Sequence, residues 1–346
     1  MIDRRALEKR EHEMLSPYAA KADESRGRFH APEPDALRTC FQRDRDRIIH
    51  CKSFRRLSHK TQVFISASGD HYRTRLTHTL EVAQISRTIA RALSLNEDLT
   101  EAISLGHDLG HTPFGHTGER ALSQAIGAQR ALTPDQSVGL FRHNEQSLRV
   151  VDVIENAGEG LNLSYEVRDG IRCHTGGLVA ATLEGRIVAV SDRIAYINHD
   201  IDDAIRAGFM TEDALPESTK RVLGRSHSAR IATLVNDMVT ASDGRDEIAQ
   251  TPEVAAAMQE LRAFLFDNVY TTSDVRHEAP KCEQLLIQLF DHFIVHLDEV
   301  PDEYRRCAQG DPVVAVRDYI SGMTDRYARS LYERLFVPYN WGQGSF

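Results

Sequence analysis

Apolar residues recur along this chain at the spacing of amphipathic helices. Between residues 77 and 93, a single helical stripe carries His78, Val82, Ile85 and Ile89. This pattern predicts a helix with one buried face. The same periodicity predicts further helices at residues 96–109, 186–207, 261–270, 281–297 and 313–336.

Capping residues indicate where two of these helices begin or end. Asn96 and the two acidic residues after it supply an N-cap and a favourable first turn, and Gly110 is expected to stop that helix. Gly208 is expected to end the helix over residues 186–207 in the same way. Alternation typical of strands is rare: residues 62–65 form one short candidate strand, for which a loop is the alternative.

Glycine and proline cluster near residues 112–118, 156–160 and 169–178, which we interpret as connections. The first forty residues are polar and charged and indicate an arm rather than a domain. Together these patterns predict an all-α fold in a single large domain. Its expected parts are an N-terminal arm (1–40), a core (41–210) and a C-terminal helical part packed on the core (211–346).

Composition narrows the class of protein. The 346 residues are 41% hydrophobic and 27% charged, as in an ordinary soluble globular protein. The net charge of −9, with both signs interspersed, argues against a chain that mainly coats nucleic acid, although a local basic cleft stays open. No apolar run reaches the roughly 18 residues of a membrane span. No apolar signal segment follows the start, so we expect a cytoplasmic protein without a membrane partner.

The cysteines fit a reducing compartment. They are odd in number and scattered, and no CxxC pair occurs among them. We therefore expect reduced thiols rather than disulfides. The five are Cys40, Cys51, Cys173, Cys282 and Cys307.

The densest candidate chemistry lies in residues 106–117, which contain three histidines and an aspartate among glycines. His107 and Asp108 are adjacent. Neighbours on a helix point about 100° apart, so both reach one point only where a helix ends or faces a cavity. An imidazole and a carboxylate that converge in this way are typical of a transition-metal site. His111 and His116 follow in a Gly/Pro-rich stretch, where they are free to bind a substrate.

Two further residues complete a candidate ligand set. His78 lies on the buried stripe of its helix, and Asp192 lies within the apolar segment 187–194, where an unpaired carboxylate is costly. Three helices that bring His78, Asp192 and the His107–Asp108 pair together would bind one divalent ion and leave positions open for water or a phosphate oxygen.

Each member of this set also has a simpler interpretation. His78 alone could be a hydrogen-bonded core histidine, and Asp192 alone could form an ion pair with Arg193 or Arg186. The His107–Asp108 dipeptide arises by chance in many proteins. The order and context of all four residues favour the metal site.

The order His78, His107-Asp108, Asp192 resembles the HD superfamily of metal-dependent phosphohydrolases. More blocks resemble its deoxynucleoside triphosphate triphosphohydrolases, the bacterial dGTPase-like members above all. The similarity covers roughly residues 15–205, with a weaker part over 261–290. The blocks are residues 41–50, 54–57, 60–64, 75–78, 107–119 and 192–196 with Asp200.

The resemblance implies an activity and a set of partners. The expected fold is the all-helical HD domain, with the catalytic core at 41–210 and additional helices. The expected reaction is hydrolysis of a dNTP, dGTP or several dNTPs, to deoxynucleoside and inorganic triphosphate. One divalent ion per active site (Mn, Mg, Ni, Fe or Zn) and a homo-oligomer, a tetramer or hexamer, are implied. An allosteric dNTP and weak binding of single-stranded nucleic acid stay open.

The resemblance also assigns catalytic roles. It places His116 beside the scissile bond with Glu119 three residues on, and His111 nearby. On a helix, Glu119 can face His116 and raise the basicity of its imidazole. The pair could activate water or protonate the leaving 5′-oxygen; the simpler alternative for Glu119 is a helix cap.

Substrate contacts follow from the same resemblance. Asp192, Tyr196 and Asp200 repeat at i, i+4 and i+8 and share one helix face. A tyrosine ring against the deoxyribose would exclude a 2′-hydroxyl, while Asp200 could bond the 3′-hydroxyl; the alternative is a core aromatic. For His143, a surface position is the alternative. The full expected set is Gln62, Arg75, His143, Arg193, Tyr196 and Asp200, with Arg55, Arg56 and Lys60 as further candidate cations for the triphosphate.

Two rival functions use the same residues. One is another HD phosphohydrolase, a nucleoside monophosphatase or a phosphodiesterase. The other is a non-catalytic HD protein that binds nucleotides or single-stranded nucleic acid. The blocks around Gln62, the His116–Glu119 pair and Tyr196 favour the triphosphohydrolase.

Overall fold

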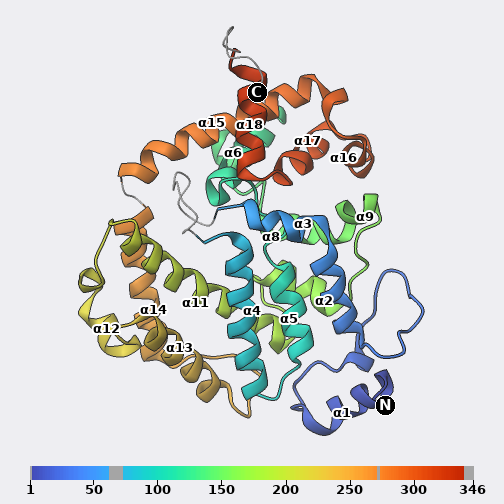
Figure 1. The fold of residues 1–346 in the computed structure, drawn as a ribbon, viewed down its shortest axis with the longest axis vertical. Coiled ribbons are helices and arrows are strands. Elements are labelled where there is room, and N and C mark those ends of the chain that lie inside the picture. The colour runs from blue at the N-terminus through green and yellow to red at the C-terminus, as the bar shows by residue number, and fades with distance from the viewer. Residues whose placement is uncertain (1, 62–72, 271–272, 339–346) are drawn as a thin grey trace, which may run out of the picture.

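The computed structural model describes residues 2–61, 73–270 and 273–338 (Figure 1). The structure is 70% helical, and the described ranges contain no strand beyond an isolated bridge between Thr61 and Thr74. The predicted all-α class is therefore confirmed. The candidate strand at residues 62–65 lies outside the described residues.

The α-helices follow one another along the whole chain. Their bounds are α1 Arg4–Met14, α2 Cys40–His50, α3 Lys52–Arg56, α4 Arg75–Ala92, α5 Glu97–Gly106, α6 Gly115–Gln129, α7 Pro134–Ser137, α8 His143–Arg149, α9 Glu155–Gly158, α10 Tyr165–Cys173, α11 Leu183–Arg206, α12 Glu217–Leu223, α13 His227–Ser242, α14 Pro252–Leu265, α15 Ser273–Val295, α16 Asp302–Cys307, α17 Pro312–Ser321 and α18 Asp325–Phe336. Within the described ranges, no helix is both long and apolar enough to cross a membrane.

Helices with a clear buried stripe lie where periodicity predicts them. α4, α5 and α11 match their expected ranges to within a few residues, although α5 already ends at Gly106 and the chain turns over residues 107–110. The expected single helix at 313–336 is wrong. Two helices, α17 and α18, occupy that range, and Thr324 caps the second by accepting from the backbone N–H of Tyr327.

The expected connection at residues 169–178 is also wrong in its first half, because α10 continues to Cys173. Gly170 serves close packing there rather than a turn. A Cβ on Gly170 would lie 2.5 Å from Cδ1 of Ile103 on α5, and a Cβ on Gly106 would lie 2.5 Å from Cδ1 of Ile171 on α10. The two helices approach through this reciprocal pair of contacts.

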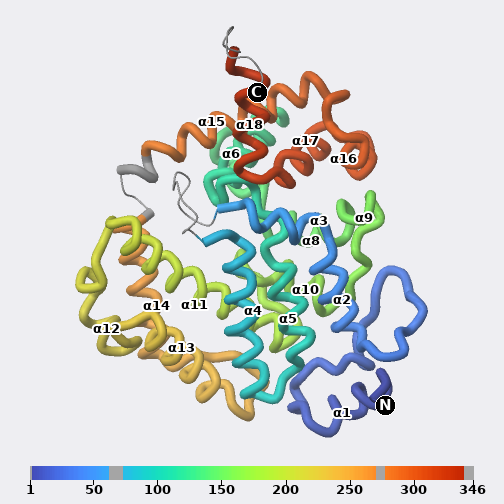
Figure 2. Tube along the Cα trace, in the orientation of Figure 1, coloured from blue at the N-terminus to red at the C-terminus, as the bar shows by residue number. Residues whose placement is uncertain are grey.

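The apolar core consists of two clusters. The first joins α2, α4, α5, α10 and α11 with α12, α13 and α14. In the second, α6 packs against α15 and α17, and α18 packs against α15. Figure 2 shows α6, in green-blue, among the orange and red helices from the end of the chain. The division of the chain at residues 40 and 210 stays a prediction.

One carboxylate joins the two parts of the fold next to the predicted site. Asp325, at the start of α18, accepts from the backbone N–H and the hydroxyl of Thr61, at 2.9 and 2.5 Å, and from the N–H of Phe114 at 3.1 Å. Phe114 has a left-handed φ of 62° and leads directly into α6. Lys60 binds the carbonyl oxygens of His111 and Ser321 at the same place.

The N-terminal arm is anchored by a buried ion pair. The Arg28 guanidinium bonds the carboxylate of Asp44 on α2, and the two side chains are 5% and 0% exposed. Arg28 also donates to the carbonyl oxygens of Asn162 and Cys40, at 2.6 and 2.8 Å. Ser164 donates to the other oxygen of Asp44 through its N–H and its hydroxyl.

We predict that Arg28→Ala lowers the free energy of unfolding by about 3–5 kcal/mol, because Asp44 would be left as a buried, unpaired carboxylate. Denaturant titration followed by circular dichroism measures this change. The matched control is Arg38→Ala, which removes an exposed pair with Asp46 on the same helix and should leave stability nearly unchanged. Equal effects of the two substitutions would contradict the prediction.

Candidate metal and catalytic site

Four predicted residues meet where three helices converge. His78 lies one turn into α4, Asp192 lies in the middle of α11, and His107 and Asp108 follow the last residue of α5. Because α5 ends at Gly106, the turn over residues 107–110 lets both neighbours face the same point. His78, His107 and Asp108 are buried, and Asp192 is half-buried.

The donor atoms of this cluster lie within a few ångströms of one another. Nε2 of His78 is 2.9 Å from Oδ1 of Asp192, and Nε2 of His107 is 3.7 Å from the same oxygen. Oδ1 of Asp108 is 3.5 Å from Nε2 of His107, and its Oδ2 is 3.9 Å from Nε2 of His78. Asp192 therefore contacts His78 instead of forming the ion pair with Arg193 or Arg186 that was the alternative.

These residues are suited to hold a divalent ion. His78, His107 and Asp192 form a group whose donor atoms lie within 4.8 Å of one another. Ligands bound at about 2.1 Å to one ion lie about 3–4 Å apart. Nδ1 of His107 lies 2.6 Å from the carbonyl oxygen of Ser104 and so carries the proton. Its Nε2 is buried without a hydrogen bond to any described residue, as in a metal-binding imidazole.

Positive charge surrounds the two carboxylates. Arg75, also on α4, donates to Oδ2 of Asp108 at 2.9 Å. Burial would raise the pKa of Asp108, but the imidazoles of His107 and His111 and the guanidinium of Arg75 hold it well below its usual range. Burial would likewise raise the pKa of Asp192, but the hydrogen bond with His78 and the neighbouring imidazole of His107 keep this pKa low. Both carboxylates are thus available as anionic ligands.

A second hydrogen-bonded group adjoins the first. Oε1 of Glu119, on α6, lies 2.5 Å from Nδ1 of His143 at the start of α8. Oε2 of Glu119 lies 3.6 Å from Nδ1 of His116. The ring of His143 stacks on that of His111 with centroids 3.9 Å apart. Glu119 therefore lies between two imidazoles, and its shorter contact is with His143, not with its predicted partner His116.

This group combines a buried interior with an exposed edge. His116 has a side chain that is 73% exposed, whereas His111 and His143 are buried. Burial would raise the pKa of Glu119, but the nearby imidazole of His116 and the hydrogen bond from His143 hold it well below its usual range. Burial would lower the pKa of His143, but the hydrogen bond and charge of Glu119 raise it. His143 is thus a buried donor to Glu119, not the surface residue that was its alternative.

His174 also belongs to this group, although the sequence analysis did not identify it. Its Nε2 lies 3.1 Å from Nε2 of His143, and its ring meets that of His107 edge to face, with centroids 5.0 Å apart. Burial and the neighbouring imidazoles of His107 and His143 lower the pKa of His174 to about 3. A signal was present, because residue 174 continues the buried stripe of Val167 and Ile171; the glycines around it suggested a connection.

The remaining predicted residues border the cluster on α11. This helix is continuous from Leu183 to Arg206, so Asp192, Tyr196 and Asp200 share one face. Asp200 is buried, Tyr196 is half-buried and Arg193 is exposed. Gln62 lies outside the described residues. The substrate roles of these residues stay predictions.

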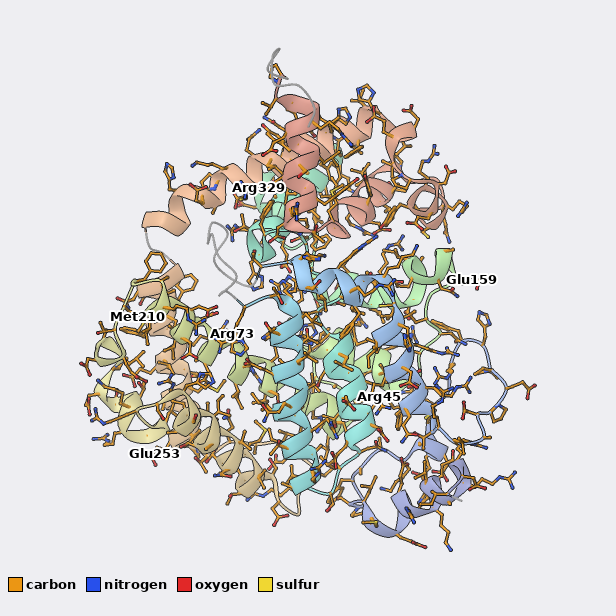
Figure 3. The ribbon with its side chains drawn as sticks, in the orientation of Figure 1. Arg45, Arg73, Glu159, Met210, Glu253 and Arg329 are labelled. Carbon is orange, nitrogen blue, oxygen red and sulfur yellow. The ribbon has the colours of Figure 1, made fainter. Side chains whose placement is uncertain are left out.

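The candidate cations Lys60 and Arg56 have structural partners, and so does Arg73, which the sequence analysis did not name. Lys60 is buried and bonds two carbonyl oxygens, and burial lowers its pKa to about 7. Arg56 donates to the carbonyl oxygen of Gly322 at 3.2 Å. Arg73, labelled in Figure 3 between α4 and α11, faces three carboxylates, those of Asp203, Asp202 and Glu81 at 3.2, 3.4 and 3.5 Å.

Comparison with known proteins places these residues in a family. The HD domain matches residues 75–197, which contain all four candidate metal ligands, and the phosphohydrolase-associated domain matches residues 248–334. Proteins named "Deoxyguanosinetriphosphate triphosphohydrolase-like protein" match almost the full length. The one from Caldanaerobacter subterraneus subsp. tengcongensis is 54% identical, covering 98% of this chain and 97% of its own.

Other relatives of the same name are less similar in sequence. The relative from Desulfatibacillum aliphaticivorans is 46% identical, with 98% of this chain and 99% of its own covered. The relative from Bordetella pertussis is 41% identical, with 93% and 96% covered. The chain therefore belongs to the HD-domain phosphohydrolases and, among them, to the family of deoxyguanosinetriphosphate triphosphohydrolase-like proteins.

Proposed function

We propose that this chain hydrolyses dNTPs to deoxynucleoside and inorganic triphosphate, with the help of one divalent ion. The observation that carries the proposal is the placement of a His/Asp group able to hold an ion directly beside the His116–Glu119–His143 group. One side can take a phosphate and the other can move a proton. The names of the relatives support the same substrate class.

His78, His107, Asp108 and Asp192 would hold the ion. When bound, a divalent ion would supply Lewis-acid polarisation of a phosphate oxygen and lower the pKa of a water molecule. Two imidazoles and two carboxylates accept several metals, and Mn, Mg, Ni, Fe and Zn are all compatible with such a set. Arg75, bonded to Asp108, would add positive charge where negative charge grows on the phosphate.

His116 would exchange the proton. It is the exposed member of its group, so substrate can reach it, and Glu119, with an oxygen 3.6 Å from Nδ1, would orient its ring. Nε2 of His116 would then either take a proton from the attacking water or give one to the leaving 5′-oxygen. His111, stacked on His143, would complete this side of the site. Arg193, at the exposed edge of α11, is suited to the outer phosphates.

The sugar would lie along α11. Tyr196 would pack against C2′ and leave no room for a hydroxyl there, while Asp200 would accept from the 3′-hydroxyl. Gln62 and His143 are further proposed contacts with substrate. We also propose, from the family resemblance, a cytoplasmic homo-oligomer, either a tetramer or a hexamer. An allosteric dNTP and weak binding of single-stranded nucleic acid are secondary proposals.

Product analysis tests the reaction. We expect each hydrolysed dNTP, incubated with protein and Mg²⁺ or Mn²⁺, to release intact triphosphate, because cleavage at the α-phosphorus leaves the chain of three phosphates whole. Anion-exchange chromatography separates the products, and protein treated with chelator is the control. Release of pyrophosphate or single phosphate would overturn the proposal and favour another HD phosphohydrolase. Tight dNTP binding without turnover would favour a nucleotide-binding protein.

A pair of substitutions separates metal binding from proton transfer. We predict that His107→Ala loses tightly bound metal and activity together, because it removes a donor from the buried group. His116→Ala should keep its metal and lose about 100-fold or more in kcat, as for a lost general acid or base. Elemental analysis and steady-state kinetics give the two readouts. Full metal content in His107→Ala, or wild-type kcat in His116→Ala, would refute these assignments.

Sugar selectivity is predicted to depend on the ring of Tyr196. Tyr196→Ala should narrow the difference in kcat/KM between dGTP and GTP, mainly by losing activity on dGTP. Tyr196→Phe keeps the ring and is the matched control, so it should retain the selectivity. If the unmodified protein hydrolyses dGTP and GTP equally well, Tyr196 does not act in this way.

A further inference from the structure

His174 is a buried histidine that the proposed chemistry leaves without a task. It forms the C-cap of α10, and its Nδ1 lies 2.7 Å from the carbonyl oxygen of Ile171. A carbonyl oxygen can only accept, so Nδ1 of His174 carries the proton and its Nε2 presents a lone pair. His107 has the same arrangement at the end of α5, with Nδ1 bonded to the carbonyl oxygen of Ser104.

The lone pair of His174 is directed at His143. The two Nε2 atoms lie 3.1 Å apart, so one of them must donate. The donor is assigned to His143, because its Nδ1 faces the anionic carboxylate of Glu119, which favours a ring protonated on both nitrogens, whereas Nδ1 of His174 faces only a neutral carbonyl oxygen. The second nitrogen of His143, Nδ1, lies 2.5 Å from Glu119. Both ends of the His143 ring are therefore fixed by hydrogen bonds, one to His174 and one to Glu119.

Helix packing places His174 for this contact. α5 and α10 approach closely because Gly106 faces Ile171 and Gly170 faces Ile103. His107 follows Gly106 directly, and His174 lies one turn beyond Ile171. The close approach brings the two C-cap histidines into edge-to-face ring contact, so His174 is packed against His107 on one side and bonded to His143 on the other.

We propose that His174 is a positioning residue of the catalytic site, which accepts the Nε2–H of His143 and thereby orients the His143 ring to hold Glu119 beside His116. Without this acceptor, the His143 ring can turn about its side-chain bonds, and Glu119 loses its hydrogen bond with His143. The consequence for turnover rests on the proposed function. The orientation of His143 rests only on the hydrogen bonds described above.

Two substitutions at the same position test the proposal. His174→Phe keeps an aromatic ring against His107 but removes the acceptor, and we expect kcat to fall about 10- to 100-fold with KM little changed. His174→Gln has a side-chain carbonyl oxygen that can reach the position of the imidazole Nε2, and we expect it to retain most of kcat. Metal content, measured by elemental analysis, should stay at the wild-type level in both variants.

A spectroscopic readout tests the orientation without any substrate. In the ¹⁵N-labelled, Mg²⁺-loaded protein, the buried Nε2–H of His143 should give a downfield imidazole proton resonance, assigned by its disappearance in His143→Gln. We expect this resonance to be lost in His174→Phe. The matched control is His199→Phe, since His199 is also buried against a candidate ligand, His78, with centroids 5.5 Å apart, and has no bond to His143 among the described contacts. This variant should keep the resonance.

The outcomes separate the two proposals. Loss of the resonance in His174→Phe, together with retained metal and rescue of kcat by His174→Gln, supports the positioning role. An unchanged resonance in His174→Phe overturns it, and so does loss of the resonance accompanied by loss of metal, which would mean that His174 acts on His107 instead. If the unmodified protein does not hydrolyse dNTPs, the resonance still decides the role of His174, while the proposed function alone fails.

Discussion

The fold depends on the compensation of buried charge between α4, α5 and α11. Asp108 and Asp192 lie where three helices meet, and each ionised carboxylate would cost several kcal/mol there without partners. His78, His107 and Arg75 supply those partners within 4 Å. Since each partner comes from a different turn or helix, the two carboxylates find all their partners only when the three helices are correctly placed relative to one another. The most polar part of the interior therefore also specifies how the helices are arranged.

Two groups of hydrogen-bonded side chains lie next to each other in this interior. The first offers donor atoms suited to a divalent ion, and the second links Glu119 with His143, His116 and His174. Ring contacts from His107 to His174 and from His111 to His143 connect them. A site of this kind can handle a phosphate and a proton at neighbouring positions, and the charges of the two groups influence one another. Such proximity suits the proposed hydrolysis at phosphorus.

Local sequence patterns predicted most of the helices and the four candidate metal ligands, for physical reasons. A buried stripe such as that of α4 has a period that can be recognised along the chain, and a carboxylate such as Asp192 stands out in an apolar helix. Gly170 was wrongly assigned to a connection, because the sequence does not distinguish a glycine that allows close helix contact from a glycine that allows a turn. The break before Asp325 was missed although Thr324 is a good N-cap. Glu119 contacts His143 because the segment leading into α8 is bonded to α6, where the N–H of Phe141 donates to Ser123 at 3.1 Å, a tertiary relation that local spacing does not contain.

The carboxylate of Asp325 has a consequence for the order in which the protein folds. It accepts from Thr61 and Phe114, which are 264 and 211 residues away along the chain. Contacts this remote carry a large loop-closure entropy and form late. Phe114 has its left-handed backbone at the entrance to α6, the helix that carries His116 and Glu119. During synthesis on the ribosome, the N-terminal helices can therefore collapse first, while the turn before α6 acquires its last hydrogen bond only after α18 has emerged and docked.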